Sequence, residues 1–208
     1  MRKGIAVIGL QTGDEGKGNK VDFLASLAAQ HVDCTIELPT EKKTILVERF
    51  QGGANAGHTL QVSDQSYKLH QVPSGILTPE AFNLIGEGMY LNPKKLLSEI
   101  RELHARGIKI TPHNLGIAAT AHVTLDYHLE DDQAQFQRKD HTTTGNGIKP
   151  TAVDKYGRVG IRFIEFLDEQ VMEECLRRRF PQGMPSRYGS HALFAQRYAE
   201  EREFLAQF

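Results

Sequence analysis

Residues 13–18, Gly-Asp-Glu-Gly-Lys-Gly, combine three glycines with two carboxylates and a lysine. Glycines let a backbone approach a polyphosphate, N–H groups at the start of a following helix point at its oxygens, and Lys17 adds a positive charge. The Walker A pattern is not met at its first glycine or its Ser/Thr position. Asp14 and Glu15 would repel a phosphate unless Mg²⁺ lay between them, or unless Asp14 took a proton from a substrate. The pattern favours a phosphate-binding loop, and an ordinary glycine-rich corner between a strand and a helix is the alternative.

A second glycine-rich segment, residues 51–59, follows residues 44–50, which we predict to be a strand. The first segment likewise follows a predicted buried strand at 4–10 and precedes a predicted helix at about residues 19–30. The apolar face of that helix is expected to contain Leu24, Leu27 and Ala28. Because the carboxyl ends of parallel strands meet at one edge of a sheet, where ligands usually bind, both loops are predicted to lie there.

The elements that follow are indicated by local signals. Residues 72–75 have turn composition, residues 84–86 suggest a short strand, and Asn92 followed by proline starts a helix that Gly107 ends. The predicted buried face of this helix consists of Leu96, Leu97, Ile100 and Leu103. The next region is only weakly periodic, and residues 117–119 are predicted to be strand-like.

A third unusual segment, residues 141–150, contains hydroxyl groups, glycines and a lysine that suit phosphate or ribose contacts. A solvated linker has a similar composition, and the residues alone favour the linker. Two helical patterns follow at about residues 163–179 and 190–207. The residues between them, 181–185, have the composition of a hinge.

Composition excludes several functional classes. The chain has 208 residues and a formal net charge of −1, which gives no reason to expect nucleic acid or an anionic membrane as a partner. Its two cysteines, Cys34 and Cys175, are too few for a disulfide framework and show no metal-ligand spacing, which fits a reducing cytoplasm. No apolar stretch approaches the roughly 18 residues of a membrane span.

Four segments together resemble the adenylosuccinate synthetase family. They are residues 13–18, 51–59, 73–77 and 143–148, in the family's order and approximate spacing, and the resemblance runs from about residue 4 to the C-terminus. It implies an α/β fold, with a mostly parallel central sheet, flanking helices and glycine-rich phosphate-binding loops at the carboxyl ends of strands. It also implies GTP-dependent condensation of IMP with L-aspartate to adenylosuccinate, through a 6-phosphoryl-IMP intermediate, in AMP biosynthesis.

The resemblance assigns roles in catalysis. Asp14 is the expected general base that removes the proton from N1 of the purine, so that O6 attacks the γ-phosphate of GTP. His58 is expected to donate to the oxygen between the β- and γ-phosphates, a role that fits a protonated imidazole. Lys17 adds its charge, and the Asp14 carboxylate and Gly57 carbonyl are expected to bind Mg²⁺.

The nucleotide-binding residues implied by the resemblance come from all three loops and one later position. They are Asp14, Glu15, Gly16, Lys17, Gly18, Asn55, Ala56, Gly57, His58, Thr59, Thr144 and Arg158. Thr144 matches the threonine that binds the IMP phosphate. Arg158 matches an arginine that reaches IMP in the neighbouring subunit, which implies a homodimer. The alternative for Arg158 is a solvated charge cluster with Asp154 and Lys155.

The chain departs from the family pattern in several places. Asn146 replaces a common arginine, which removes a guanidinium that could bind a carboxylate. Residues 31–43 form an extra stretch that we expect to be a surface insertion. The family's C-terminal half, which supplies guanine recognition and most aspartate binding, is not found. We therefore expect residues 1–208 to be a partial synthetase domain, apparently truncated at the C-terminus.

Two alternatives to the full synthetase remain open. The first is a catalytically incomplete nucleotide-binding module. The second is a relative that is specific for a 2-amino-purine nucleotide, against which the presence of Asp14 argues, because that group usually lacks an aspartate at this position.

Overall fold

The structure of the chain is a computed structural model that describes residues 4–8, 16–31, 36–37, 42–43, 45–62, 64–137 and 143–208. Two of the predicted site residues, Asp14 and Glu15, lie outside these ranges. So does most of the first glycine-rich segment, of which Gly16, Lys17 and Gly18 are described.

A parallel sheet forms the centre of the fold. Its longest strand, β6 (Ala81–Leu91), pairs along one edge with β3 (Ile45–Gly53). Along the other edge it pairs with β7 (Leu115–Ile117) and β8 (His122–Val123), and all three pairings are parallel. Most of β6 is buried, as expected of a parallel strand covered on both faces. The predicted α/β architecture with a parallel sheet is confirmed.

Two short antiparallel pairs accompany this sheet. β4 (His58–Val62) pairs with β5 (Gln65–Leu69), and β1 (Ile36–Glu37) pairs with β2 (Lys42–Lys43) within the expected insertion. Residues 51–59 are therefore not one continuous loop. Gly52 and Gly53 end β3, and His58 begins β4, so that the turn between the strands is short.

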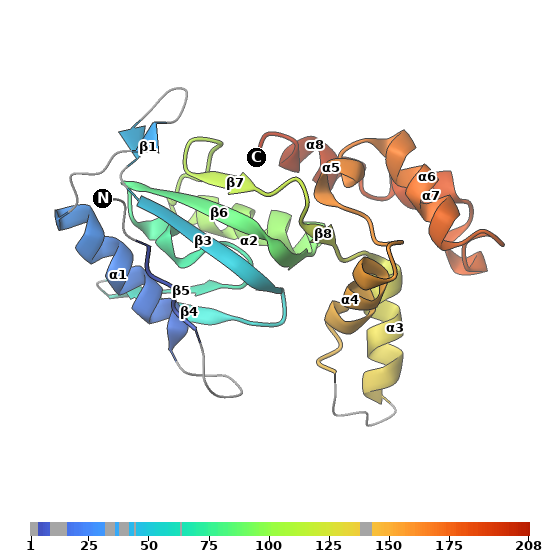
Figure 1. Cartoon of the computed structure of the whole chain (residues 1–208), viewed down its shortest axis with the longest axis horizontal. Helices are drawn as coiled ribbons and strands as arrows, with labels where there is room; N and C mark the ends of the chain where they lie inside the picture. The colour runs from blue at the N-terminus through green and yellow to red at the C-terminus, as the bar shows by residue number, and fades with distance from the viewer. Residues whose placement is uncertain are drawn as a thin grey trace.

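Helices flank the sheet. α1 (Lys17–His31) packs against β3 and β4, and α2 (Pro93–Ala105) lies behind the sheet in Figure 1. The signals predicted for α2 are all present: Asn92 Oδ1 accepts the N–H of Lys95 at 3.0 Å, and Gly107 follows the helix with φ +84°. The four residues of its predicted buried face are at most 3 % exposed.

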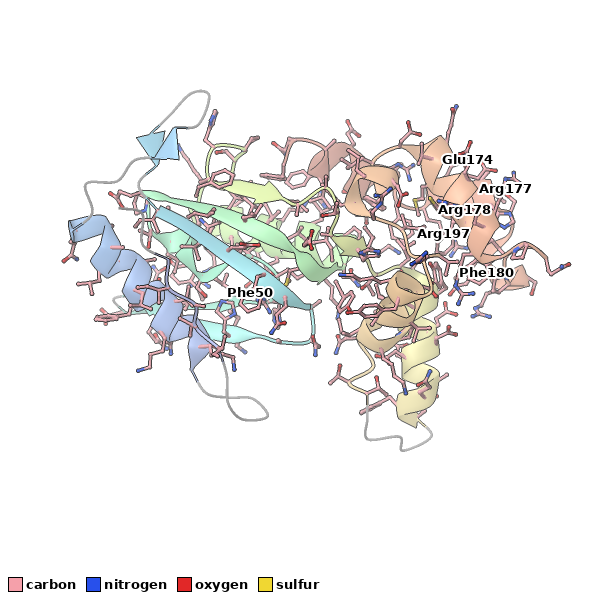
Figure 2. All side chains as sticks on the ribbon, viewed as in Figure 1. Phe50, Glu174, Arg177, Arg178, Phe180 and Arg197 are labelled. Atoms are coloured by element: carbon pink, nitrogen blue, oxygen red, sulfur yellow. The ribbon has the colours of Figure 1, made fainter. Side chains whose placement is uncertain are left out.

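The remaining helices extend beyond the sheet. The elements are η1 (Ser74–Leu77), α3 (Asp126–Gln137), α4 (Ile148–Tyr156), α5 (Phe163–Phe166), α6 (Glu169–Arg179), η2 (Ser186–Tyr188), α7 (His191–Gln196) and α8 (Ala199–Leu205). Figure 1 shows α3 and α4 beyond the carboxyl ends of β3 and β6. Figure 2 shows Phe50 on the sheet and Arg177, Arg178 and Arg197 at the helical end. One hydrophobic core runs through both parts.

The predicted buried strand at residues 4–10 is wrong where it is described. Residues 4–8 form no strand, and the side chains of Ile5 and Ile8 are 74 % and 65 % exposed. An apolar run becomes a strand only when a neighbour supplies ladder hydrogen bonds, and β3 and β6 pair with each other without these residues. The predicted face of α1 is wrong at Leu27, which is 41 % exposed, whereas Leu24 and Ala28 are half-buried and Ala25 is buried.

Other differences concern the length of elements. The short strand expected at residues 84–86 is part of the eleven-residue β6. The helix expected at 163–179 is divided into α5 and α6, because Asp168 accepts the N–H groups of Gln170 and Val171 and thereby starts a new helix. The helix α3 lies where the sequence showed only weak periodicity. Within the described residues, no helix is long and apolar enough to cross a membrane.

Candidate functional site

The two predicted glycine-rich segments line a single open pocket of about 760 Å³. Its walls are residues 7–8, 16–19 and Val21 near the start of the chain, 47–52 of β3, 55–59 of the following turn and β4, and Pro73 with Ser74. Eight predicted site residues therefore come together, namely Gly16, Lys17, Gly18, Asn55, Ala56, Gly57, His58 and Thr59.

The imidazole of His58 lies between three elements. As the first residue of β4 it pairs with Leu69 of β5, and its Nε2 is 3.0 Å from the hydroxyl of Ser74. A Cβ added at Gly18 would lie 2.5 Å from Cδ2 of His58, so only glycine allows the start of α1 to approach the ring this closely. The glycine-rich start of α1 thus determines the space available to the imidazole.

The environment of His58 disfavours its charged form. Burial of the ring, followed by the positive charges of Arg49 and His70, lowers the pKa of His58 to about 4. The expectation of a protonated imidazole does not hold for the protein without ligand, because desolvation and neighbouring cations both destabilise the imidazolium. At neutral pH the ring carries one N–H donor and one acceptor nitrogen.

Arg49 of β3 holds the turn that precedes His58. Its Nη2 donates to the carbonyl of Ala56 at 3.0 Å and lies 3.5 Å from that of Gly53. Its Nη1 is buried and has no hydrogen-bond partner in the part of the chain that the structure describes. The guanidinium thereby fixes the turn and places a positive charge on the pocket wall.

The segment at 143–147 is a fixed loop, and the linker favoured from composition is wrong for these residues. The buried carboxylate of Asp132 accepts the Thr143 hydroxyl on Oδ1 and the N–H of Gly147 on Oδ2 at 2.8 Å. Asn146 accepts from Lys95 Nζ at 2.6 Å and donates to the carbonyl of Thr144 at 3.1 Å. These partners hold both ends of the loop.

This loop lies next to the turn after β3. A Cβ added at Gly53 would overlap Cδ1 of Ile148, the first residue of α4, so the two segments touch at a glycine. Thr144 itself is exposed and is not among the residues that line the pocket.

Arg158 lies apart from the pocket, two residues after the end of α4, and its side chain is exposed. Among the described residues it is the only non-glycine with positive φ, at +59°. The neighbouring Asp154 is buried and bonded to Arg179 and His128. The alternative in which Arg158 forms a solvated charge cluster with Asp154 and Lys155 is therefore wrong for Asp154.

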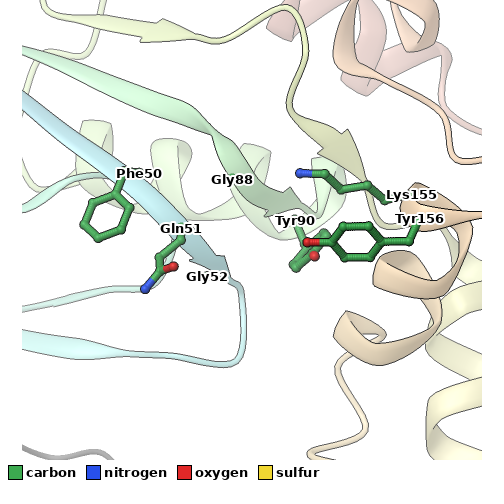
Figure 3. A pocket seen from close by; sticks show the side chains of 7 residues that line it. All are labelled: Phe50, Gln51, Gly52, Gly88, Tyr90, Lys155 and Tyr156. Atoms are coloured by element: carbon green, nitrogen blue, oxygen red, sulfur yellow. The ribbon is translucent and has the colours of Figure 1, made fainter. Parts of the chain in front are cut away.

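A second, smaller pocket of about 470 Å³ lies between the sheet and α4. In Figure 3 Lys155 and Tyr156 of α4 lie near Tyr90 of β6, with Phe50 and Gln51 of β3 across the opening. Lys155 Nζ is 5.8 Å from the centre of the Tyr90 ring. Phe50, Gln51 and Gly52 line both pockets, so the two are adjacent.

Two residues of the site were not predicted. Ser74 lies in a segment that the sequence analysis recognised by its turn composition and as one of the four family-like segments, but no role was assigned to this serine. Arg49 lies in a predicted strand and was not considered as a site residue. An arginine two residues before a Gln-Gly-Gly segment is a usable signal, because an inward guanidinium can bind the carbonyls of such a turn. Within the described residues there is no group of three or more His, Cys, Asp or Glu side chains that could hold a metal ion.

The parallel sheet with flanking helices defines an α/β protein, and a glycine-lined pocket lies beside β3 at the edge of this sheet, where ligands of such proteins usually bind. The family model for adenylosuccinate synthetase matches residues 6–203, and the chain belongs to this family.

Similar proteins bear the same name. The adenylosuccinate synthetase of Streptococcus sanguinis is 42% identical over 177 residues, and that of Prochlorococcus marinus is 46% identical over 176 residues. These matches cover 84% and 83% of this chain but only 37% and 36% of the relatives. The structure of fully ligated adenylosuccinate synthetase from Plasmodium falciparum is 28% identical, with a TM-score of 0.67, over 94% of this chain and 44% of that one. The chain thus spans about a third of the length of these curated relatives.

Proposed function

We propose that the chain carries the nucleotide site of an enzyme of AMP biosynthesis that condenses IMP with L-aspartate at the expense of GTP. The observation that supports this most directly is the single pocket in which Gly16–Gly18 and Asn55–Thr59 face each other around His58. Glycine backbone, a lysine and the Arg49 guanidinium together suit a polyphosphate. Membership of the family favours GTP as its source.

In the proposed first step, Asp14 removes the N1 proton of IMP and O6 attacks the γ-phosphate, with GDP as the leaving group. His58 donates a hydrogen bond to the oxygen between the β- and γ-phosphates, where negative charge develops. A neutral imidazole can serve this role through its one N–H, so no permanent charge on His58 is required. In the second step, the amino group of aspartate displaces the phosphate from C6.

Magnesium is the proposed cofactor. The Asp14 carboxylate and the Gly57 carbonyl are hard oxygen donors of the type that Mg²⁺ prefers, and Gly57 lines the pocket. When bound, the ion would reduce the negative charge on the phosphates. The donor set fits this ion better than zinc or copper, which favour nitrogen and sulfur ligands.

IMP binding involves the remaining predicted residues. Glu15–Lys17 and Asn55–His58 are proposed to contact IMP, Gly57–Thr59 to share the GTP phosphates, and Thr144 to bind the IMP phosphate. Arg158 is proposed to reach the IMP of a second copy in a cytoplasmic homodimer. Its exposure and its position outside the pocket are compatible with a contribution to a neighbouring subunit.

The test is release of inorganic phosphate by the purified 208-residue chain with IMP, L-aspartate, GTP and Mg²⁺, each omitted in turn, beside a full-length synthetase. Release that requires IMP and aspartate is the expected result. Release with GMP in place of IMP would indicate the 2-amino-purine relative instead. No release, together with binding of IMP or GTP by calorimetry, would indicate a nucleotide-binding module without catalysis.

A further inference from the structure

A buried serine contacts the imidazole of His58 at one of its ring nitrogens. Ser74 is 6 % exposed, and its Oγ lies 3.0 Å from Nε2 of His58. We propose that Ser74 is a positioning residue that holds this imidazole in one orientation and one tautomer for its contact with phosphate. The inference rests on the proposed function, in which His58 donates to a phosphate oxygen.

The segment that carries Ser74 is fixed by buried polar side chains. Glu99 of α2 accepts the backbone N–H groups of residues 70–72, at 2.8, 2.9 and 3.2 Å. The Gln71 side chain donates to the carbonyl of Asn92 at 3.0 Å and accepts its N–H at 2.7 Å. Ser74 therefore comes from a braced segment two residues beyond these contacts, which is what a positioning group requires.

The imidazole is confined on a second side by α1. A Cβ added at Gly18 would meet Cδ2 at 2.5 Å and Cγ at 2.7 Å, so the ring lies against the helix backbone. Close packing leaves few alternative ring positions, and the hydrogen bond to Ser74 selects among those that remain.

The proposal also assigns the proton to one of the two ring nitrogens. A neutral imidazole has one N–H and one lone pair, and a hydrogen bond at one nitrogen sets the role of the other. Because Nε2 contacts Ser74, Nδ1 is the nitrogen left to donate to phosphate, and in that tautomer Nε2 accepts the proton of the Ser74 hydroxyl. Without the hydroxyl, the imidazole can exchange between tautomers and can flip about its χ2 angle. Its N–H group then faces the ligand for only part of the time.

The first experiment observes the ring directly. Protein labelled with ¹⁵N at histidine is measured by long-range ¹H–¹⁵N correlation at neutral pH, and a His58→Gln variant identifies the His58 signals. We expect the ¹⁵N shifts of one tautomer in the wild type and in Ser74→Thr, and averaged shifts of two tautomers in Ser74→Ala. Unchanged His58 shifts in Ser74→Ala would contradict the proposal.

The second experiment measures turnover. Ser74→Ala should lower kcat for phosphate release by about threefold to tenfold, the factor of one net hydrogen bond, with the KM for IMP unchanged. Thr78→Val removes another buried hydroxyl of the same region and should leave kcat unchanged. Altered shifts with an unchanged kcat would show that the ring is held without use in the reaction, which would overturn the positioning role.

The two experiments separate the two proposals. If the wild type releases no phosphate, the proposed function fails for this chain, while the NMR comparison still decides whether Ser74 holds His58. Thermal unfolding of each variant is recorded so that a difference in His58 shifts is not a difference in folding.

Discussion

The carboxylate of Asp132 accepts the backbone N–H of Gly147 at 2.8 Å, fifteen residues along the chain. The same carboxylate accepts the hydroxyl of Thr143, so one buried side chain of α3 holds both ends of the loop that carries Thr144. The loop is therefore held by α3 before any ligand binds, and Asp132 determines where Thr144 lies.

Replacing Asp132 by asparagine should destabilise this loop. The amide would turn its NH₂ group towards one of two hydrogen-bond donors, which leaves a buried polar group unpaired and should lower the free energy of unfolding by about 1–3 kcal/mol. IMP should bind more weakly, while GTP binding should change little. Urea unfolding and calorimetry measure these quantities. The neighbouring exposed Asp131→Asn is the control, and equal IMP affinity in both variants would contradict the role of Asp132.

Gly18→Ala should displace the imidazole of His58 while the protein still folds. Alanine is favoured over glycine by about 1 kcal/mol in a helix interior, and Gly18 lies in the first turn, so α1 itself should gain less than this amount. The new Cβ would lie 2.5 Å from the imidazole, and the ring must move away. We expect intact folding with strongly reduced phosphate release.

The control for Gly18→Ala is Gln30→Ala, at an exposed position of the same helix. It also places alanine in α1 but is not among the residues that line the pocket. If Gly18→Ala kept a normal rate, the close approach of α1 to His58 would have no part in the reaction.

The elements with strong local signals were predictable from the sequence. Asn92, Pro93 and Gly107 delimit α2 because capping and helix termination act within a few residues, and the spacing of its leucines reports which face is buried. The glycine-rich segments also indicated the pocket, since positive φ or close approach leaves few other residue types possible.

Features that depend on distant contacts were not predictable in this way. The fixed loop at 143–147 depends on Asp132, and the hydroxyl of Ser74 acquires a role only when Glu99 brings residues 70–72 against α2. The neutral state of His58 likewise depends on burial and on Arg49, which no local pattern reveals. The strand prediction for residues 4–8 was wrong for the same reason, because strand pairing depends on tertiary contacts.

Asp154 should give the stability of the fold a dependence on pH. This buried carboxylate accepts from Arg179 Nε at 2.8 Å and lies 3.1 Å from His128 Nε2. Burial raises its pKa, but the hydrogen bonds and charges of His128 and Arg179 outweigh burial, and the pKa is lowered overall. The ionised carboxylate therefore stabilises the fold above the unfolded-state pKa, and this contribution is lost as the pH falls through the lowered folded-state value.

Asp154→Asn should accordingly reduce the free energy of unfolding at neutral pH by about 1–3 kcal/mol, with a smaller difference from the wild type at acidic pH. Urea midpoints across the acidic range measure this. Glu130→Gln, which affects the pair with Arg187 at the surface, should change stability little. A deficit in Asp154→Asn that did not shrink at low pH would contradict the assignment.

Arg158 occupies a backbone conformation that favours glycine. Its N–H donates to the carbonyl of Lys155 at 3.1 Å, and the N–H of Val159 donates to that of Asp154 at 3.0 Å, which is the Schellman ending of α4. A side chain with φ +59° is strained at this position, and such strain is usually retained where the side chain has a function.

Arg158→Gly should therefore improve stability and impair binding. Glycine removes the strain of the left-handed conformation but has greater conformational entropy in the unfolded chain. The net effect should raise the free energy of unfolding by about 0.5–1 kcal/mol. Loss of a charge-assisted contact to IMP should weaken IMP binding by roughly tenfold to a hundredfold. Arg158→Leu keeps the strain and removes the charge, so it should weaken IMP binding equally without the gain in stability.

Because the arginine is proposed to act in a second copy, mixing Arg158→Leu with an inactive Asp14→Asn variant should restore part of the activity by forming one intact site per heterodimer. Absence of restored activity in a mixture shown to exchange subunits would place Arg158 outside the shared site.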